Sequence, residues 1–450
     1  MNHPIQLNDS ILITIKRLGI NGEGIGYYKR LAVFVEDALP EEVVEVKITE
    51  IKEKYVKGVI TQIKEKSPNR MDPPCPYFGK CGGCQIQHMN YDTQLLEKKH
   101  LVMEAFERYY QGDMRKIPIY DTIGMDEPFF YRNKSSLPLR HDGKKVVAGM
   151  YAKNSNHLVF IDECMVESKL INEARKLILD RLTQAQVDIY NPKTKKGILR
   201  FLIIRAFEDT KETQVTFVLT KPDRKLIDLL SKLPYTSHNY SINADDKAIE
   251  LFGKETILVS GKETIQGKLM NLSFSISPMA FYQLNSKQTE VLYEQIKKAC
   301  HLTGQEKILD CYCGIGSIGM MLAPTAKEVR GIDTNKEGIE NAKLFALQNQ
   351  IGNAFFYAGN ILPYMDQFEK EGFIPDIVVV DPPRKGLELN FIQYLQKSKI
   401  KKIVYVSCNP ATLAKNASHL HKEYIIRWIQ PLDMFAQTAN VEAVCLLERR

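Results

Sequence analysis

The second half of this chain alternates short apolar runs with amphipathic stretches, and this alternation restricts the fold more than any other feature. Three of the runs are continuous: KILDCYC (307–313), IVVVD (377–381) and IVYVSC (403–408). Strands of a parallel sheet are continuously apolar in this way because helices cover both faces of the sheet. Residues from about 277 onward therefore predict a doubly wound α/β domain.

A glycine-rich segment follows the first run. Asp310 leads into Cys-Tyr-Cys-Gly-Ile-Gly-Ser-Ile-Gly, and VRGIDTN (329–335) then supplies a second strand that carries Asp333. Such glycines allow a tight turn and close approach of the backbone to a ligand, while an acid at the second strand accepts hydrogen bonds from ribose hydroxyls. The spacing of Gly314, Gly316 and Gly319 also fits a dinucleotide site, so these residues alone leave NAD open.

Two acids at strand ends favour S-adenosylmethionine (SAM) over NAD. Asp310 precedes the glycine loop, and Asp381 begins Asp-Pro-Pro-Arg at the end of a later strand. Both features are typical of SAM-dependent methyltransferases. Cys408, in VSCNPAT (406–412), ends the following strand, at the sheet edge where ligands bind. We therefore expect Cys408 close to the methyl group of SAM.

A cysteine beside a methyl donor suggests chemistry on a pyrimidine ring. A turn leading into a helix can lower a thiol pKa, and the thiolate is a strong nucleophile. Addition of Cys408 to carbon 6 of uracil would make carbon 5 nucleophilic enough to take a methyl group. A general base must then remove the proton from carbon 5, and Glu442 in NVEAVCLLERR is our candidate. A buried structural cysteine and an exposed strand-edge carboxylate are the alternative interpretations.

Four other cysteines suggest a metal centre. Cys75, Cys81 and Cys84 lie in a glycine-rich loop, and Cys164 in VFIDECMV is the best candidate for a fourth ligand. Zinc usually takes paired Cys-x2–4-Cys units, so a distant fourth cysteine favours a 4Fe–4S cluster. The spacing leaves zinc and the absence of a metal open. It matches neither ferredoxin pattern nor the CxxxCxxC spacing of radical-SAM enzymes, which indicates a structural or RNA-facing cluster.

The rest of the chain divides into two further units. β-rich runs at 11–16, 32–35, 43–50 and 55–62, with glycine-rich turns at 19–26, predict an OB-type barrel. Residues 92–110 have helical spacing, with Leu95, Leu96, Val102, Ala105 and Phe106 on one face. Strands at 199–207 and 213–220 and a helix at 224–233 predict a mixed α+β domain. The expected domains are 1–64 (barrel), 65–92 with 126–276 (metal and RNA-binding), and 93–125 with 277–450 (methyltransferase).

Composition adds limits on location and partners. The net charge is +7, which permits a polyanionic partner without requiring one. Since no apolar run approaches the ~20 residues of a membrane span and the N-terminus lacks a signal-peptide core, we expect a cytoplasmic location and no membrane partner. Nine cysteines in a cytosolic chain argue for metal binding or catalysis rather than disulfides.

These motifs together resemble one family. The chain is similar to the RNA (uracil-5)-methyltransferases, in particular the iron–sulfur, TRAM-containing branch that modifies bacterial 23S rRNA. The most specific signature is Asp381-Pro-Pro-Arg384-x-Gly386, followed by Ile403-Val404-Tyr405-x-Ser407-Cys408-Asn409-x-x-Thr412. The barrel with Pro40-Glu41-Glu42 resembles a TRAM domain, and SPMAFYQLN (277–285) resembles the family's entry into the catalytic domain.

The resemblance implies roles for individual residues. Cys408 would be the nucleophile, Glu442 the base, and the cluster would be a 4Fe–4S centre held by Cys75, Cys81, Cys84 and Cys164. The residues that contact SAM in the family correspond here to Gln283, Tyr312, Asp333, Asn360 and Asp381. FFYRNKSSLPLR (129–140) resembles the RNA-facing segment, where charge could come from Arg132, Lys134, Arg140, Lys144 and Lys145. The C-terminal motif departs from the family, with Ala436 in place of proline and Asn440 in place of histidine.

The implied activity is SAM-dependent methylation of carbon 5 of one or two uridines in 23S rRNA, by a monomer that does not act on DNA. The target base would be flipped out of its stack, and the remaining RNA would be held by shape and phosphate contacts. A tRNA uracil-5-methyltransferase is the first alternative, although that branch typically lacks the barrel and the cysteine cluster. A non-catalytic RNA-binding or assembly protein is the second.

Overall fold

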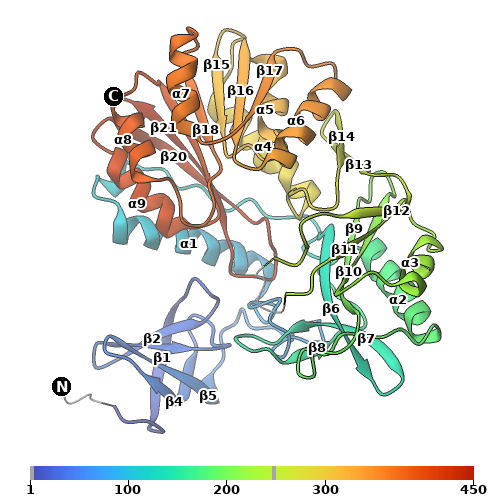
Figure 1. Ribbon diagram of the computed structural model, residues 1–450. Helices are drawn as coiled ribbons and strands as arrows, with labels where there is room; N and C mark the ends of the chain where they lie inside the picture. The colour runs from blue at the N-terminus through green and yellow to red at the C-terminus, as the bar shows by residue number, and fades with distance from the viewer. Residues whose placement is uncertain (1–4, 246–249) are drawn as a thin grey trace.

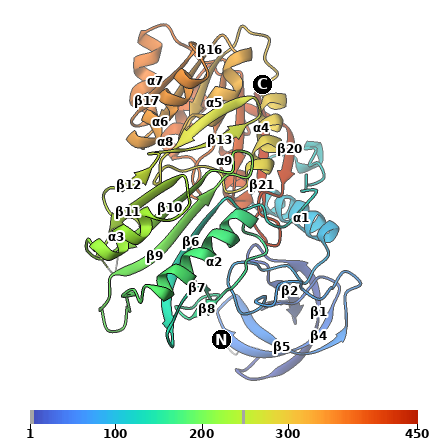
Figure 2. The same ribbon diagram turned by 90° about the vertical axis from the view of Figure 1, so that its right-hand side faces the viewer.

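The computed structural model describes residues 5–245 and 250–450. Within these ranges the chain forms a closed barrel, two seven-stranded sheets and a two-stranded hairpin. Figures 1 and 2 show three lobes: the barrel, the central sheet with its helices, and the C-terminal sheet with helices on both faces. The long helix α1 (Tyr91–Tyr109) runs along the side of the C-terminal lobe that faces the barrel (Figure 1).

The N-terminal barrel closes in the order β1-β2-β3-β5-β4. Its strands are β1 (Ser10–Leu18), β2 (Gly24–Tyr28), β3 (Leu31–Val35), β4 (Val43–Ile51) and β5 (Tyr55–Glu65). Alternate side chains such as Ile11, Ile13 and Ile15 point into a single core, as the period-2 pattern requires. The predicted small barrel is confirmed, but β2 was missed because its glycines were interpreted as a turn.

The central lobe is a mixed sheet in the order β12-β11-β10-β9-β6-β7-β8. The strands are β6 (Lys134–Asp142), β7 (Lys145–Tyr151), β8 (Leu158–Phe160), β9 (Leu199–Ala206), β10 (Thr213–Leu219), β11 (Ser237–Ile242) and β12 (Ile257–Gly261). Helices α2 (Lys169–Gln184) and α3 (Arg224–Ser231) pack on this sheet and share its apolar core.

The C-terminal sheet has the order β17-β16-β15-β18-β19-β21-β20. Its strands are β15 (Lys307–Cys311), β16 (Glu328–Asp333), β17 (Ala354–Ala358), β18 (Ile377–Val380), β19 (Lys402–Ser407), β20 (Tyr424–Leu432) and β21 (Glu442–Arg449). The chain runs outward from β15 to β17, then returns to β18 on the other side of β15. This reversal creates a topological switch point between β15 and β18, where ligands bind in open α/β sheets.

Helices cover both faces of this sheet, which confirms the α/β prediction. Neighbouring residues of each buried strand enter opposite cores: Val379 and Val404 face one core, whereas Val380 and Ile403 face the other. One core includes α4 (Ser286–Cys300), α5 (Ser317–Leu322) and α6 (Lys336–Gln348); the other includes α1, α7 (Ile361–Lys370), α8 (Leu389–Lys397) and α9 (Pro410–Leu420). Short 3₁₀ turns lie at Met114–Lys116 and Ala323–Thr325.

The hairpin of β13 (Ile265–Leu269) and β14 (Leu272–Ile276) packs in the C-terminal core. The sequence predicts these residues in the central domain, because a short β-hairpin has the same sequence pattern wherever it packs. Figure 1 shows β13 and β14 between the central and C-terminal lobes.

The predicted buried face of helix α1 is confirmed at Val102, Ala105 and Phe106 and is wrong at Leu96. Leu101, Val102 and Phe106 lie in the C-terminal core, whereas Leu96 is 49% exposed. The same face buries polar side chains, Gln94 and Lys98 among them. An apolar-periodicity argument misses these positions because it counts only hydrophobic residues.

The buried ion pair of Lys98 and Asp433 fastens α1 to the segment between β20 and β21. Lys98 Nζ lies 2.5 Å from Asp433 Oδ1, and neither side chain is exposed. The hydroxyl of Tyr91 donates to Asp433 Oδ2 at 2.8 Å, and Lys98 also donates to the carbonyl of Phe435 at 3.2 Å. Burial lowers the pKa of Lys98, and Asp433 opposes that change.

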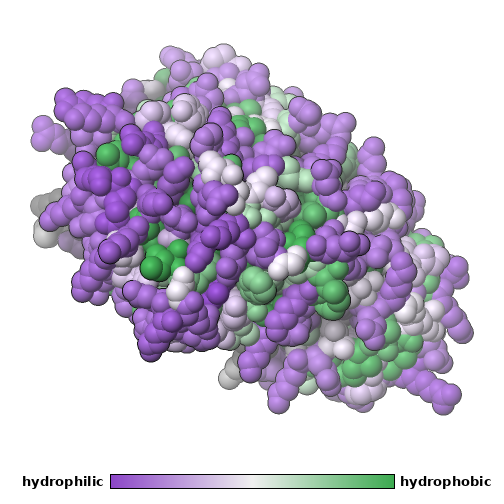
Figure 3. Space-filling view, turned by 90° about the horizontal axis from the view of Figure 1, so that it is seen from above, coloured by the Kyte–Doolittle hydropathy of each residue, from purple (hydrophilic) through white to green (hydrophobic). Residues whose placement is uncertain are grey.

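Among the described residues, none of the helices is long and apolar enough to cross a membrane. The face seen in Figure 3 is largely hydrophilic, and its hydrophobic side chains occur in small separate groups.

Replacing Lys98 by methionine should destabilise the fold, because Asp433 would remain as a buried carboxylate without its cation. Breaking a buried pair in this way costs about 3–5 kcal/mol, measured as the free energy of unfolding in urea. Lys99→Met is the matched control, since Lys99 pairs with an Asp121 side chain that is 95% exposed, and it should change stability by less than ~0.5 kcal/mol. Equal effects of the two substitutions would contradict the importance of the buried pair.

Candidate active site

The predicted site residues lie along one edge of the C-terminal sheet. Five adjacent parallel strands each end at one of them, and in spatial order from β17 to β19 these are Asn360, Asp333, Tyr312, Asp381 and Cys408. Asn360 begins α7 and is exposed, whereas Tyr312, Asp333, Asp381 and Cys408 are partly buried. The strand topology therefore brings together residues that are spread over almost a hundred positions of the sequence.

The glycine loop after β15 is held by acids on two sides. The amide of Gly314 donates to Asp333 Oδ2 at 2.9 Å, and the amide of Gly319 donates to Asp310 Oδ2 at 2.9 Å. Gly314 and Gly316 have φ values of +57° and +74°, which side chains rarely adopt. A Cβ on Gly314 would meet no atom within 4 Å, so the loop backbone faces open space that a ligand can occupy.

Gln283 lies apart from these strand ends. It precedes α4, is partly buried, and its carbonyl accepts a hydrogen bond of 2.9 Å from Asn133 Nδ2. In the same stretch the hydroxyl of Tyr131 donates to the carbonyl of Ala436 at 2.9 Å. The segment 129–140 therefore contacts both the entry to the C-terminal domain and the C-terminal loop.

Strand pairing places Glu442 beside Cys408. Strands β19 and β21 are antiparallel, and Ser407 pairs with Ala443. Cys408 follows Ser407, and Glu442 precedes Ala443, so the next position in this register sets the thiol beside the carboxylate. Glu442 is buried, and Asp381 lies close enough to influence both groups electrostatically.

This crowding of acids raises the pKa of each group. Burial raises the pKa of Asp381 to about 7. Burial, with the charge of Asp381 added, raises the pKa of Glu442 well above its ordinary value. The pKa of the Cys408 thiol is raised by burial and then by Glu442 and Asp381. The turn after β19 was expected to lower this pKa, and that expectation is wrong because the neighbouring carboxylates and burial outweigh it.

Arg384 opposes these effects. Its positive charge and a side-chain hydrogen bond to Cys408 act to lower the thiol pKa, and its charge also acts to lower the pKa of Glu442. Arg384 Nη2 donates to Asn440 Oδ1 at 2.8 Å, and its carbonyl accepts from Thr412 Oγ1 at 3.0 Å. Asn440 thus contacts the guanidinium group that faces the thiol.

The loop between β20 and β21 is held to distant parts of the chain. The carbonyl of Gln437 accepts from the amides of Gln85 and Ile86 at 3.0 and 3.1 Å. Gln94 and Gln437 exchange two further hydrogen bonds, of 3.0 and 3.1 Å. Because Gln85 follows Cys84 directly, the loop that ends at Glu442 contacts the cysteine-rich segment.

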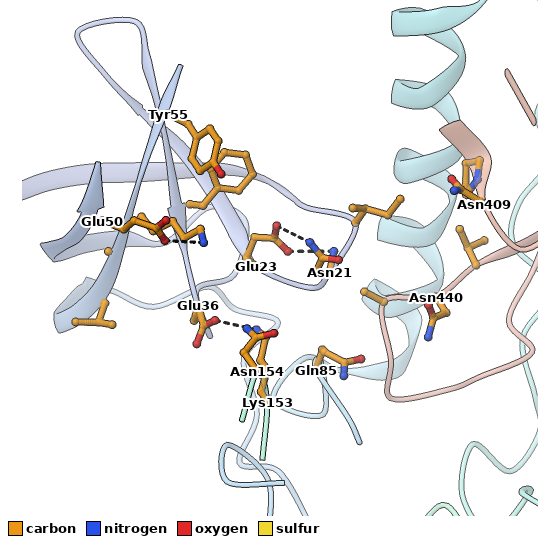
Figure 4. A pocket seen from close by; sticks show the side chains of 18 of the residues that line it. Asn21, Glu23, Glu36, Glu50, Tyr55, Gln85, Lys153, Asn154, Asn409 and Asn440 are labelled. Carbon is orange, nitrogen blue, oxygen red and sulfur yellow. Dashed lines mark hydrogen bonds and ion pairs between the residues drawn. The ribbon is translucent and has the colours of Figure 1, made fainter. Parts of the chain in front are cut away.

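A cavity of about 1210 Å³ separates Cys408 from the barrel. Arg384, Cys408, Asn409 and Asn440 form its wall on the C-terminal side. In Figure 4, Asn409 and Asn440 lie on one side of the space, and Glu50 and Tyr55 lie across it on the barrel. The nucleophile candidate therefore faces a space large enough for a macromolecular ligand to enter.

The structure brings the four predicted metal-binding cysteines to one small cavity of about 40 Å³, lined by Cys75, Cys81, Cys84 and Cys164. The turn of Cys164 is held by Asn172 of α2, which accepts from the Cys164 amide at 2.9 Å and donates to its carbonyl at 3.0 Å. Burial raises the pKa of Cys84 to about 12 and that of Cys164 to about 11. Over residues 5–245 and 250–450, no group of three or more His, Cys, Asp or Glu has the arrangement needed to hold a metal ion.

The basic side chains of segment 129–145 are not equivalent. Lys144 and Lys145 are exposed at the turn between β6 and β7. Lys134 is different, because burial, together with the charges of Arg205 and Arg132, lowers its pKa to about 7. Lys134 is therefore a weaker source of positive charge at neutral pH than the sequence suggested.

Several residues around the site were absent from the sequence predictions. Tyr91, Gln94, Lys98 and Gln437 hold the C-terminal loop, and Arg384 was quoted only as part of a motif. Their contacts join positions up to 343 residues apart, so no local spacing signals them. Only the unusual polar side chains on the apolar face of α1 could have indicated a buried polar contact.

Comparisons with known proteins find one family and similar proteins over nearly the whole chain. Residues 90–358 and 364–450 match the tRNA (Uracil-5-)-methyltransferase family, and residues 6–61 match the TRAM domain. Proteins named uncharacterized RNA methyltransferase are similar over nearly the full length. The one from Halalkalibacterium halodurans is 44% identical over 97% of this chain and 95% of its own. The one from Listeria innocua is 42% identical over 100% of this chain and 99% of its own.

A solved structure is also similar over most of the chain. It is the Pyrococcus abyssi tRNA (uracil-54, C5)-methyltransferase in complex with S-adenosyl-L-homocysteine. The TM-score is 0.76 at 29% identity, and the match covers 96% of this chain and 98% of that one. Because a match this complete extends into the barrel, the barrel does not by itself separate rRNA-modifying from tRNA-modifying proteins.

Removing the charge of Arg384 should make Cys408 less reactive, because a nearby cation stabilises the thiolate. With Arg384→Met we expect alkylation of Cys408 by iodoacetamide at pH 8 to slow by about 3- to 10-fold. Mass spectrometry of the peptide that contains Cys408 measures this rate. In both proteins the rate should rise with pH, since only the thiolate reacts. Lys385→Met is the control, because the Lys385 side chain is 73% exposed and pairs with Glu388; an equal loss there would contradict the role of Arg384.

Proposed function

This chain belongs to the tRNA (uracil-5-)-methyltransferase family, and we propose that it transfers a methyl group from SAM to carbon 5 of a uridine in 23S rRNA through a covalent Cys408 adduct. The observation that carries the proposal is the convergence of three side chains beside one cavity: Cys408 and Arg384 line it, and buried Glu442 lies next to Cys408. Cys408 can act as nucleophile, Glu442 lies next to it across the sheet, and Arg384 faces both.

The proposed reaction begins with loss of the Cys408 proton to solvent in the cavity, a step that Arg384 favours and the neighbouring carboxylates oppose. The thiolate forms a bond to carbon 6 of the uracil, and the electrons of the 5,6 double bond move toward carbon 5 and the 4-carbonyl. SAM supplies an electrophilic methyl group. Carbon 5 bonds to that methyl as the carbon–sulfur bond of the sulfonium breaks. Glu442 then takes the proton from carbon 5, the double bond re-forms, and the sulfur of Cys408 leaves.

The raised pKa values suit this order of events. Glu442 next to an ionised Cys408 would place two negative charges side by side, so the site holds a proton until substrate arrives. Once the thiolate has been consumed in the bond to carbon 6, that repulsion is removed, and Glu442 can release its proton to solvent and then act as a base.

The strand-edge residues fit SAM. We propose that the Asp333 carboxylate accepts hydrogen bonds from the ribose hydroxyls of SAM and that Asn360 contacts the adenine. Tyr312, Gln283 and Asp381 would surround the methionine moiety. The support is the open space above Gly314 and the convergence of four of these five residues at adjacent strand ends.

The choice of 23S rRNA rests on the resemblance to the cluster-containing, TRAM-containing branch of the family. A tRNA uridine is the second candidate substrate, supported by the nearly full-length similarity to the Pyrococcus abyssi protein whose name specifies tRNA. Both substrates require the same chemistry at Cys408, so the distinction lies in the RNA that fits the cavity.

The experiment supplies purified protein and SAM with unmodified 23S rRNA or unmodified tRNA, then measures 5-methyluridine by mass spectrometry after digestion. We expect 5-methyluridine in 23S rRNA only. 5-Methyluridine in tRNA only would identify tRNA as the substrate and leave the proposed reaction unchanged. No signal in either RNA, with SAM bound, would contradict the proposed activity.

Glu442→Gln should trap the covalent intermediate, because the proton on carbon 5 would have no base to take it and Cys408 could not leave. The expected result is a protein–RNA adduct that survives SDS and requires SAM. Cys408→Ala should abolish both the adduct and 5-methyluridine formation. Cys300→Ala is the control, since Cys300 is buried at the end of α4, and it should retain activity. An adduct that persists in Cys408→Ala would contradict the assignment.

We also propose that Cys75, Cys81, Cys84 and Cys164 hold a 4Fe–4S cluster. The support is their shared cavity. Zinc would draw four thiolates to about 2.3 Å from one ion, whereas a cluster of several irons needs more widely spaced ligands.

Anaerobic reconstitution with ferrous iron and sulfide tests this cluster. We expect about four iron atoms per chain, as for a 4Fe–4S centre. Cys81→Ala should lose the iron, and Cys300→Ala should retain it. A single zinc ion per chain after purification, with no iron uptake, would support zinc instead.

A further inference from the structure

We propose that the barrel wall opposite Cys408 holds a second, unpaired nucleobase of the RNA, stacked against the aromatic pair Phe34 and Tyr55. The inference rests on the proposed function, because it takes the RNA strand at Cys408 as the occupant of the cavity. It adds a place for a base that is not itself methylated.

The aromatic pair provides an exposed ring surface. Phe34 lies on β3 and Tyr55 begins the neighbouring parallel strand β5; their ring centroids are 5.1 Å apart and the rings cross at 69°. Both line the cavity and are partly exposed. Ile20 and Val59 line the same cavity and are 51% and 44% exposed. Apolar and aromatic surface of this kind is what stacked bases cover in single-stranded nucleic-acid sites.

The charges around the cavity favour a base over a phosphate. The lining includes three carboxylates and three cations, which cancel: Glu23, Glu36 and Glu50 against Lys57, Lys153 and Arg384. Two of these cations are already paired with barrel carboxylates: Lys57 lies 2.7 Å from Glu50, and Lys153 of the central lobe lies 3.2 Å from Glu36. Phosphate binding requires an excess of positive charge, which this neutral surface lacks. A neutral base with hydrogen-bonding edges fits it.

The size of the cavity and its continuity with the site indicate a neighbour of the target uridine. Its volume of about 1210 Å³ exceeds that of most small-molecule sites, which hold roughly 300–1000 Å³. One continuous space therefore reaches from Cys408 to Tyr55 and has room for more than one nucleotide. Figure 4 shows Tyr55 on the barrel strand across this space from Asn409, the residue after Cys408.

Binding measurements on Tyr55 variants test the inference. The probes are unmodified 23S rRNA and unmodified tRNA, each titrated with S-adenosylhomocysteine-saturated protein. Loss of one base stack weakens single-stranded binding by about 1–3 kcal/mol, so Tyr55→Ala should raise Kd by about 5- to 100-fold for the RNA that is methylated. Tyr55→Phe keeps the ring and should bind within about twofold of the unmodified protein.

Tyr27→Ala is the matched control, because Tyr27 is a 49% exposed barrel tyrosine that does not line the cavity. Its Kd should not change. If Tyr55→Ala binds as tightly as the unmodified protein, or if Tyr27→Ala weakens binding equally, the inference is overturned. Photo-crosslinking of 4-thiouridine-substituted RNA to the unchanged protein gives an independent reading. Crosslinks in the peptide Tyr55–Lys57 are expected, and their absence would contradict the proposal even if Tyr55→Ala failed to fold.

The same samples keep the two proposals separate. If 5-methyluridine forms and Tyr55→Ala binds RNA normally, the proposed enzymatic function is supported and the second base position is contradicted. If Tyr55→Ala weakens RNA binding but the wild-type protein forms no 5-methyluridine, the proposed enzymatic function is contradicted and the base-binding surface is supported.

Discussion

The buried ion pair between Lys98 and Asp433 holds together the parts of the chain on which the site depends. Glu442 ends the segment that starts at Asp433 and begins β21. Lys98 and Gln94, one turn apart on α1, hold its beginning and its middle, while Gln85 holds it to the cysteine-rich loop. The strand register sets the carboxylate beside Cys408, and residues more than 300 positions earlier in the chain hold the loop that leads to it.

Strand topology provides the second constraint. Five parallel strands end at one edge, so that a glycine loop, three acids and a cysteine meet although each has an ordinary local environment. This concentration of carboxylates has an electrostatic consequence. Burial raises the pKa of Asp381, burial and the neighbouring carboxylates raise the pKa values of Glu442 and Cys408, and Arg384 opposes these shifts at Glu442 and Cys408. A site that keeps its nucleophile protonated until substrate arrives is protected from unwanted thiol chemistry.

The sequence predicted well the features that depend on local pattern. Continuous apolar runs predicted β15, β18 and β19, because a parallel strand buried on both faces has a distinctive composition. The candidate site residues were then predicted from their positions at the ends of these strands. Features set by long-range contacts were missed. Leu96 was assigned to the buried face of α1 but is exposed, whereas Lys98 and Gln94 are buried on that helix. Strand β2 was hidden by its glycines, and the pKa of Cys408 is raised by burial and by Glu442, which the sheet register brings near.

The covalent role of Cys408 is the central claim, and RNA containing 5-fluorouridine tests it most directly. Fluorine at carbon 5 cannot be removed as a proton, so the reaction should stop after methyl transfer, with the base still bonded to the protein. Mass spectrometry of the digested complex should then find a methylated 5-fluorouridine nucleotide on the peptide that contains Cys408, only when SAM is present. An adduct on a different cysteine, or none with an RNA that is otherwise methylated, would contradict the account.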